Sequence, residues 1–437
     1  MALEAENAEL KKEVSQLKRE LNTVREQHDQ ELDKLIFLLI GIGLSGRLIA
    51  CIIRSVFNMP ANHSDILKKA QVYAVKATQI METYFQQMGV VAAIDEVFIE
   101  NLPVYIAVSP QSLLICNAGV YEERTEENWT KFLDEMGNLQ QTVSDRGISI
   151  LAAIAKRGDH CHQSDVFHCM HTVKKELLKM ERHCYSLIGK EEKADIELQK
   201  RKTSGRDARG HSARLRKARN DCEAAITLFD DLEQAVNLAF KALRISDGFT
   251  LNTAEQARQD LEFASEWIQY VHPCWRKVVS ALRDKHLLHY LEKVRNDLDE
   301  INVETTSMMD REHVLAVLTY LWEVQAPQRW QGKKVQISEI IRNDLERCCS
   351  NLDHVFEKLI TVLESQPKAS SSVESINSRV GFFRYSKRRF SDDFANLISV
   401  VHNMTPFMNG KRKGKSPAEI ENVNLPTMDI FELFGIA

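Results

Sequence analysis

Hydrophobic residues recur with a heptad period over the first 34 residues of the chain. Steps of four and three lead through Leu10, Val14, Leu17, Leu21 and Val24, with Glu and Lys at the flanking positions. This is the a/d pattern of a coiled coil. The seam covers only about three heptads, so a single solvated helix is the alternative. Because a polar helix with one apolar stripe needs a partner to cover it, we favour a coiled coil in residues 1–34 and a homodimer or higher homo-oligomer.

Residues 35–86 have the pattern of several short helices. Ser45 precedes an apolar-periodic run and can cap a helix, residues 58–64 are rich in turn formers, and a third helix can begin at Ser64. Helix, turn and helix fit a small DNA-binding module, although any packing of three helices gives the same pattern. We therefore predict a helix-turn-helix-like module in this region.

From residue 88 the pattern changes to that of strands. Residues 90–99 are almost continuously apolar, as in a buried central strand. The elements predicted after it are strands at 104–108 and 113–120, a helix at 123–136, a strand that ends at Asp145 and a helix at 148–155. Antiparallel-type strands, a helix and a further strand are the opening order of an RNase H-like fold. We therefore expect an α/β core of that kind.

Helical patterns dominate the middle of the chain. Charged, Leu-rich segments with a 3.6-residue period continue to residue 365, almost without a strand signal. The α/β core is therefore predicted in two parts, residues 87–175 and 366–437, with a large all-α insertion at 176–365 between them.

A strongly basic segment lies within the predicted insertion. Residues 200–219 hold nine Lys and Arg, and Ser204, Gly205 and Gly210 indicate a loop. Such a loop is most often only solvated, and contact with a DNA backbone is the competing interpretation.

Composition narrows the class of protein only a little. The chain has 437 residues, 44% of them hydrophobic and 27% charged, and its net charge of -5 neither predicts nor excludes a nucleic-acid partner. The nine Cys form no regular framework and no secretory signal is recognised, so a cytoplasmic location is expected. The most apolar stretch, residues 35–53, is interrupted by Arg47 and several Gly, so we predict a buried segment and no membrane partner.

Three carboxylates stand where α/β folds place chemistry. Asp95 interrupts the apolar run of a predicted central strand, and a buried carboxylate is costly unless it is paired, protonated or bound to a metal. Glu96 points to the opposite face. Asp145 ends a strand just before Gly147, at the edge where such sheets bind ligands. Glu374 lies in the first turn of a helix that the serines 370–372 can cap.

Each carboxylate also has an ordinary interpretation. Asp95 can be a solvated residue at a strand end, and Glu374 can be a favourable charge at a helix N-terminus. Together, however, carboxylates on two strands and a helix can converge on a pair of Mg²⁺ ions, which prefer hard oxygen ligands. Two such ions can activate the attacking oxygen and stabilise the leaving oxygen of a phosphoryl transfer.

Several segments resemble the DDE transposases of bacterial insertion sequences. They are residues 93–98, 143–147, 164–168 and 371–379, and the tail from Asn403 to Pro417. Their order and spacing agree over residues 35–425, most of the chain, and the Glu374 segment and the tail are the most specific pieces. One position departs from the pattern, because Arg146 stands where many members carry a small residue.

The resemblance implies a function and a set of residues. Asp95, Asp145 and Glu374 would be the catalytic triad that holds two Mg²⁺ (or Mn²⁺) ions on an RNase H-like core with a helical insertion. Asp165 and His168 are similar to a [C/D]xxH motif that supports the active site or the DNA. Double-stranded DNA, as element ends and target, would be the partner, and the bacterial nucleoid the location. The expected phosphate-binding residues are Arg379, Arg384, Lys387, Arg388, Arg389, Lys411, Arg412 and Lys413.

Two other classes of protein fit much of the same sequence. An RNase H-like nuclease that hydrolyses without joining strands shares every carboxylate argument. A catalytically inactive DNA-binding or helical scaffold protein would explain the coiled coil and the helical bulk. A zinc site among His160, Cys161, His162, His168, Cys169 and His171 is disfavoured because no CxxC pair is present.

Overall fold

A computed structural model describes residues 2–158, 161–305, 307–331, 333–368, 371–380 and 390–436, with side chains except those of residues 2–11, 25, 330, 371 and 379. The chain divides into two compact units. The first unit contains Met1–Gln140, Ile148–His160 and Ser372–Ala437, and the second unit contains Gln141–Gly147 and Cys161–Ser371. No helix in the described ranges is long and apolar enough to cross a membrane.

Five strands form one mixed sheet in the order β3-β2-β1-β4-β5. The strands are β1 (Val91–Ile99), β2 (Leu102–Val108), β3 (Ile115–Val120), β4 (Gln141–Ser144) and β5 (Cys161–Ser164). β1, β2 and β3 pair antiparallel, and β4 and β5 pair parallel. A two-residue turn of Glu100 and Asn101, both at positive φ, joins β1 to β2, which suits the twist of a hairpin. The mixed sheet among many helices fits the predicted α/β core with a helical insertion.

All four predicted strands are confirmed, although β3 begins at Ile115 and β4 ends at Ser144, just before Asp145. The sequence does not predict β5. Its sequence, Cys161 to Ser164, is short and polar, so it carries no strand pattern of its own. It forms because its backbone pairs with β4, and it is buried from His162 onward. A tertiary contact thus overrides a weak local preference.

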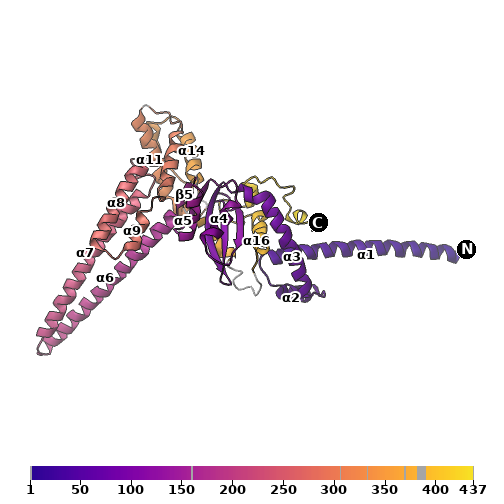
Figure 1. Ribbon diagram of the computed structural model, residues 1–437, viewed down its shortest axis with the longest axis horizontal. Coiled ribbons are helices and arrows are strands. Elements are labelled where there is room, and N and C mark those ends of the chain that lie inside the picture. The colour runs from indigo at the N-terminus through magenta and orange to yellow at the C-terminus, as the bar shows by residue number, and fades with distance from the viewer. Residues whose placement is uncertain are drawn as a thin grey trace. The chain divides into compact units, whose positions relative to one another are not determined.

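Some helices of the first unit lie against its strands, whereas most of the first helix extends away from them (Figure 1). α16, almost completely buried, packs on both α3 and β3. Ser45 caps α2 as predicted, while α3 begins at His63 behind an Asn62 cap, slightly before the predicted start. The bounds are α1 (Ala2–Gly41), α2 (Gly46–Phe57), α3 (His63–Ile80), η1 (Met81–Phe85), η2 (Gln86–Met88), α4 (Glu126–Asp134), α5 (Ile148–Lys156), α15 (Ser371–Val380), α16 (Asp392–Met404), α17 (Pro417–Ile420) and α18 (Ile430–Leu433).

The predicted coiled-coil segment is one end of a longer helix. α1 continues to Gly41, and its last turns bury Phe37 against Tyr73 and Phe434. In contrast, the heptad residues from Val14 to Val24 are exposed by 49–60% of their surface. The stripe is therefore anchored at one end and available along its length, and the pairing of two such helices stays a prediction.

The second unit is helical apart from β4 and β5. Its core joins buried residues of successive helices, among them Leu232, Val236, Ile268, Leu291 and Leu315. α6 and α7 form a long antiparallel hairpin (Figure 1). The bounds are α6 (Val166–Thr203), α7 (Arg209–Ala242), α8 (Ala254–Val271), α9 (Arg276–Leu282), α10 (His289–Asp299), α11 (Met308–Val324), α12 (Ala326–Trp330), α13 (Glu339–Glu346) and α14 (Leu352–Ser365).

The loop predicted at residues 200–219 is wrong. Only 204–208 form a turn, and the rest belongs to the ends of α6 and α7. Lys, Arg and Ala favour helix, and Leu215 is buried within α7. Gly205, at a φ of 66°, ends α6, whereas Gly210 is accommodated inside α7.

Candidate active site

The first unit brings together two of the sequence segments that carry the predicted triad. Asp95 lies in β1, half-buried, directly opposite Ile106 of β2. Asn377 Nδ2 donates a hydrogen bond of 2.6 Å to Asp95 Oδ2. Asn377 stands three residues after Glu374 on α15, so it shares a helix face with that carboxylate. The bond therefore docks the helix that carries Glu374 on the strand that carries Asp95, across 282 positions of sequence.

The local sequence explains why α15 presents this face. Val373, Ile376 and Val380 are buried and hold the helix in the first unit. Glu374 lies in its first turn and beside that apolar stripe, as predicted, and it is half-buried. Residues 369–370, which include one of the predicted capping serines, lie outside the described residues.

Asn377 is a residue that sequence reasoning missed. Its Oδ1 atom is buried and accepts no hydrogen bond from the described residues. A buried polar atom without a partner is costly and calls for an explanation. Because amide and carboxylate oxygens are the ligands that Mg²⁺ prefers, Oδ1 beside Asp95 fits a cation at this position. The sequence signals for Asn377 were its i+3 spacing from Glu374 and its place within residues 371–379, which resemble the transposase family.

Glu96 serves a different purpose from its neighbour Asp95. It projects from the opposite face of β1, where its Oε1 lies 2.7 Å from the Nε of Arg124. Burial, and then the charge of Glu96, raise the pKa of the facing Tyr105 to about 12. Glu96 is thus part of an ion pair on the other side of the strand, which leaves Asp95 as the β1 carboxylate that faces α15.

Asp145 and the Asp165–His168 motif line one cavity of the second unit. The cavity has a volume of about 480 Å³, and its polar lining includes Asp145, Arg146, Asp165, His168, Arg276, Lys277 and Ser280. Asp145 follows β4, and its Oδ1 accepts a hydrogen bond of 2.9 Å from the backbone N–H of Gly147. The turn after the strand therefore fixes the carboxylate at the cavity.

The Asp165–His168 pair has a defined geometry. Asp165 is 3% exposed and is the N-cap of α6. Its Oδ1 accepts the backbone N–H of His168 at 2.8 Å, and its Oδ2 lies 3.0 Å from His168 Nδ1. Because a carboxylate oxygen accepts, Nδ1 of His168 carries the proton in this contact. The spacing of the motif is thus that of a helix cap and the third helical residue.

Arg146, the position that departs from the transposase pattern, has its own partner. Its Nε lies 2.9 Å from Oδ2 of the nearly buried Asp284, and its NH2 group donates to Ser280 Oγ at 3.1 Å. Asp284 also accepts from Ser164 Oγ at 2.8 Å. The positive charge of Arg146 is therefore balanced within the second unit, beside Asp145.

Arg276 and Lys277 are further functional candidates that the sequence did not reveal. Both are exposed at the start of α9 and line the cavity. Within the ranges that the structure describes, neither forms an ion pair. They are therefore available to an anionic ligand. Only the fold brings them to Asp145, so no local pattern marked them.

The predicted phosphate-binding residues divide into three groups. Arg384, Lys387, Arg388 and Arg389 lie outside the described residues, as does the side chain of Arg379. Lys411 and Lys413 are exposed. Arg412 is half-buried and donates to the carbonyl oxygens of Gln111 at 2.7 Å and Pro110 at 3.1 Å, so it has a structural role in holding the tail.

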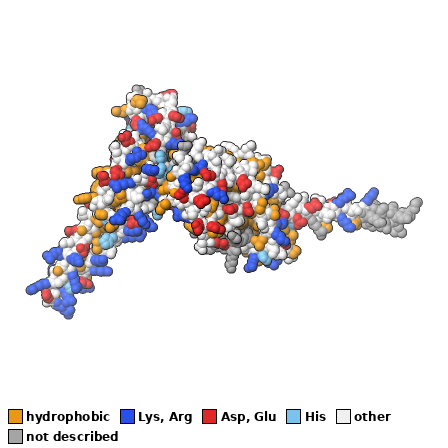
Figure 2. All heavy atoms as spheres, viewed as in Figure 1, with side chains coloured by type: hydrophobic (Ala, Val, Ile, Leu, Met, Phe, Trp, Pro, Cys, Tyr) orange, Lys and Arg blue, Asp and Glu red, His pale blue; other side chains and the backbone are white. Residues whose placement is uncertain are grey.

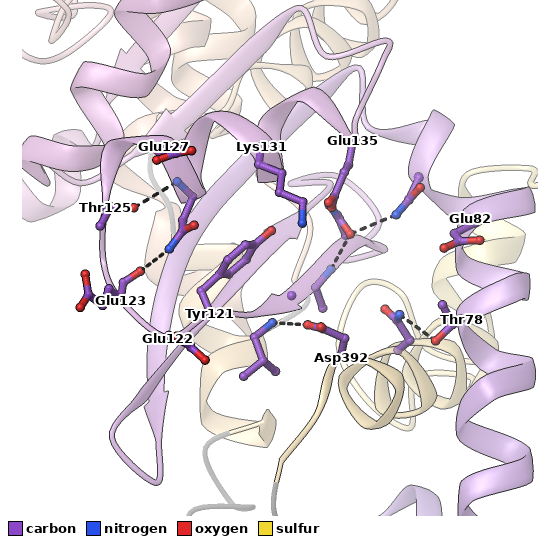
Figure 3. A pocket seen from close by; sticks show the side chains of 17 residues that line it. Thr78, Glu82, Tyr121, Glu122, Glu123, Thr125, Glu127, Lys131, Glu135 and Asp392 are labelled. Atoms are coloured by element: carbon purple, nitrogen blue, oxygen red, sulfur yellow. Dashed lines mark hydrogen bonds between the residues drawn. The ribbon is translucent and has the colours of Figure 1, made fainter.

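A different cavity of the first unit is unsuited to phosphate. It has a volume of about 990 Å³ (Figure 3). Lys131 is the only Lys or Arg in its lining, as far as the structure describes it. Burial, and then the charges of Glu135 and Asp392, raise the pKa of the lining Tyr121 well above its usual value. The acidic lining residues are Glu82, Glu122, Glu123, Glu127, Glu135 and Asp392.

No three His, Cys, Asp or Glu side chains of the described residues form a ready-made metal group. The oxygen donors of the predicted site are Asp95, Glu374 and Asn377 in the first unit and Asp145 in the second. Comparison with models of protein families and with curated proteins finds no match to this chain.

Proposed function

We propose that the protein is a DNA transposase that cuts strands at the ends of a mobile element and joins them to a target. The observation that carries the proposal is the hydrogen bond from Asn377 to Asp95. It joins two of the sequence segments on which the transposase resemblance rests. A helical scaffold without catalysis would not require a helix that carries Glu374 to dock on the strand that carries Asp95.

In this proposal Asp95, Asp145 and Glu374 hold two Mg²⁺ or Mn²⁺ ions. When bound, such ions activate the attacking oxygen and stabilise the leaving oxygen of phosphoryl transfer. The chain itself orients the ligands: Asn377 fixes Asp95, and the turn at Gly147 fixes Asp145. A first attack by water frees a 3′-hydroxyl, and attack by a 3′-hydroxyl on a target phosphodiester joins the strands.

The remaining residues of the second-unit cavity support binding of the substrate. Arg276 and Lys277 bind backbone phosphates, which positions DNA without reading its sequence. The helix-turn-helix-like module recognises the element end, and the exposed stripe of α1 pairs two subunits, which suits a reaction on two DNA ends. The bacterial nucleoid remains the expected location.

Carboxylate-to-amide variants test the proposal with a control inside the same strand. Asp95→Asn, Asp145→Asn and Glu374→Gln are each expected to lower Mn²⁺-dependent strand cleavage by about 10³-fold, equivalent to about 4 kcal/mol of transition-state stabilisation. Glu96→Gln is the matched control, because Glu96 faces Arg124 instead. It should leave cleavage within a few-fold of the wild type.

The assay measures excision and joining of a marker flanked by the DNA that adjoins the gene, with DNA binding measured in parallel. All three amide variants should still bind DNA. Cleavage that survives two of the three changes would refute the triad. Cleavage without any strand-joined product would identify a hydrolytic nuclease instead of a transposase.

A further inference from the structure

We infer that the tip of the α6–α7 hairpin, residues 200–219, is a second binding site for the phosphate backbone of duplex DNA. Measured along α6, it lies about 57 Å from the Asp165–His168 pair. The inference rests on the proposed function, because it assigns that function a DNA contact outside the cavity. The tip would hold the duplex at a fixed distance from the bond that is cut.

The tip carries a concentrated positive charge. It holds nine Lys and Arg against a single acidic residue, Asp207. All nine are exposed, and Figure 2 shows Lys and Arg side chains gathered at this end of the hairpin. Among the described residues only Arg219 of this set forms an ion pair, with Glu191 at 3.1 Å. Eight cations are therefore available to an anionic partner.

The charge is segregated along the hairpin. The shaft of the hairpin, residues 176–197 and 220–242, has the opposite balance. Its first segment holds four Lys and Arg against six Asp and Glu, and its second segment holds one against five. An ordinary solvated surface mixes both signs along its length. Here a polyanion is attracted to the tip and repelled by the shaft.

Helix stability does not account for the pattern. Cations in the last turn of α6 are favourable to the helix dipole, but Arg209 at the start of α7 is unfavourable to it. Arg214 and Arg216 follow in the same helix and bring further positive charge toward that end. A sequence selected only for helix stability would place acidic residues at the start of α7. We therefore explain the cations by their interaction with an external anion.

The hairpin is built to hold its tip in place. Leu198 of α6 and Leu215 of α7 are both buried close to the turn. Further along, Cys184 Sγ donates to the carbonyl oxygen of Ala225 at 3.3 Å, so the helices stay in contact. The turn between them has only five residues, 204–208. The tip is thus the end of a packed pair of helices.

The length of α6 sets the distance between the cavity and the tip. Asp165 caps the N-terminus of α6, and the helix has 38 residues. A rise of about 1.5 Å per residue gives about 57 Å. At about 3.4 Å per base pair this corresponds to about 17 base pairs of duplex. A duplex held at the cavity by Arg276 and Lys277 would therefore meet the tip about 17 base pairs away.

The test compares binding of short and long duplexes by the full chain. Random-sequence duplexes of about 12 and about 30 base pairs are titrated at several salt concentrations without divalent metal, because each phosphate contact adds about 0.9 to the salt dependence. The short duplex spans one contact region and the long duplex spans both. The tip variant is Lys200→Gln, Arg201→Gln, Arg206→Gln and Arg209→Gln combined.

Two further variants serve as controls. The first control exchanges Lys and Arg for each other at the same four positions. It keeps the positive charge of the tip and tests whether the tip folds. Removal of four exposed charges elsewhere in the second unit, Lys333→Gln, Lys334→Gln, Arg347→Gln and Lys358→Gln, matches the loss of net charge.

The expected result is a length-dependent change. For the wild type, the slope of log K against log salt steepens on passing from the short to the long duplex, and the four cations changed in the tip variant account for up to about 3.6 of this steepening. The tip variant loses that share, and both controls keep it. An unchanged slope in the tip variant would overturn the inference, as would an equal loss in the charge-matched control. Tip-dependent binding that is stronger to single-stranded RNA or to phosphatidylserine vesicles would also overturn it.

This outcome is independent of the proposed chemistry. Binding without divalent metal does not require the triad, so an inactive triad leaves the slopes unchanged. Conversely, if the tip contacts no DNA, the wild type should still cleave DNA and Asp95→Asn should still fail to do so.

Discussion

Replacement of Asp165 separates the structural from the chemical role of the Asp165–His168 pair. Asp165→Ala removes two interactions of the carboxylate, the cap on the N–H of His168 and the contact with His168 Nδ1. Asp165→Asn keeps an oxygen for the cap, because Asn is as good an N-cap as Asp. Its amide Nδ2 then faces Nδ1, so the ring nitrogen must accept and the proton moves to Nε2.

The sizes of the two effects follow from the geometry. Loss of an N-cap costs about 1 kcal/mol. The contact to His168 is charge-assisted, but that side chain is 42% exposed, so solvent screening reduces its contribution to about 1 kcal/mol. Asp165→Ala should therefore destabilise the start of α6 by about 2 kcal/mol. Asp165→Asn should cost less than about 1 kcal/mol, since both contacts persist in altered form.

Amide hydrogen exchange at residues 168–173 measures this locally, which avoids assuming a single unfolding transition for two units. A loss of about 2 kcal/mol corresponds to about 30-fold faster exchange in Asp165→Ala. In Asp165→Asn exchange should change only a few-fold, while the ¹⁵N shifts of His168 report the tautomer with the proton on Nε2. Exchange unchanged in Asp165→Ala, or equally fast in both variants, would refute the reasoning.

Three further predictions concern other parts of the molecule. Asn377→Ala removes the support of Asp95 and should lower cleavage by about 10–100-fold with DNA binding retained; an unchanged rate would contradict a positioning role. Burial, and then the charge of Lys285, lower the pKa of His286, so the unfolded chain binds a proton at a higher pH than the folded chain does. The melting temperature should therefore fall as the pH drops below 6.5 and through the lowered pKa of His286. The fall should be smaller in His286→Gln. Leu17→Asp, which charges the exposed stripe of α1, should reduce the oligomer to monomer in sedimentation, whereas an unaltered mass would exclude the coiled coil as the pairing element.

Local patterns predicted the elements that carry their own signals. The apolar run of β1, the Ser45 cap of α2 and the stripe of α15 beside Glu374 each lie within about ten residues. Their interpretation needs no knowledge of distant segments, because side-chain periodicity and capping are local effects. The prediction of antiparallel-type strands at β1 and β2 follows from the same kind of signal.

Other features depend on partners far away in the sequence. β5 is too short and polar to predict, and it exists through its pairing with β4. The glycines of the basic segment favour a loop and its Lys, Arg and Ala favour helix, but only Gly205 adopts a conformation that ends a helix. Asn377 could not be recognised either, since its contact with Asp95 spans most of the chain.

Charge at the second-unit cavity shows why a sequence alone cannot settle the electrostatics of a site. Arg146 follows Asp145 in the sequence, and without an acidic partner its positive charge would partly cancel the negative charge of the Asp145 carboxylate. Asp284 takes up that charge instead, and it is itself held by Ser164. The charged groups of the lining then include the carboxylate of Asp145 and the cations Arg276 and Lys277. In the proposed function, Asp145 would hold a metal ion at the reacting oxygens of the bond, and Arg276 and Lys277 would bind the phosphates along its backbone.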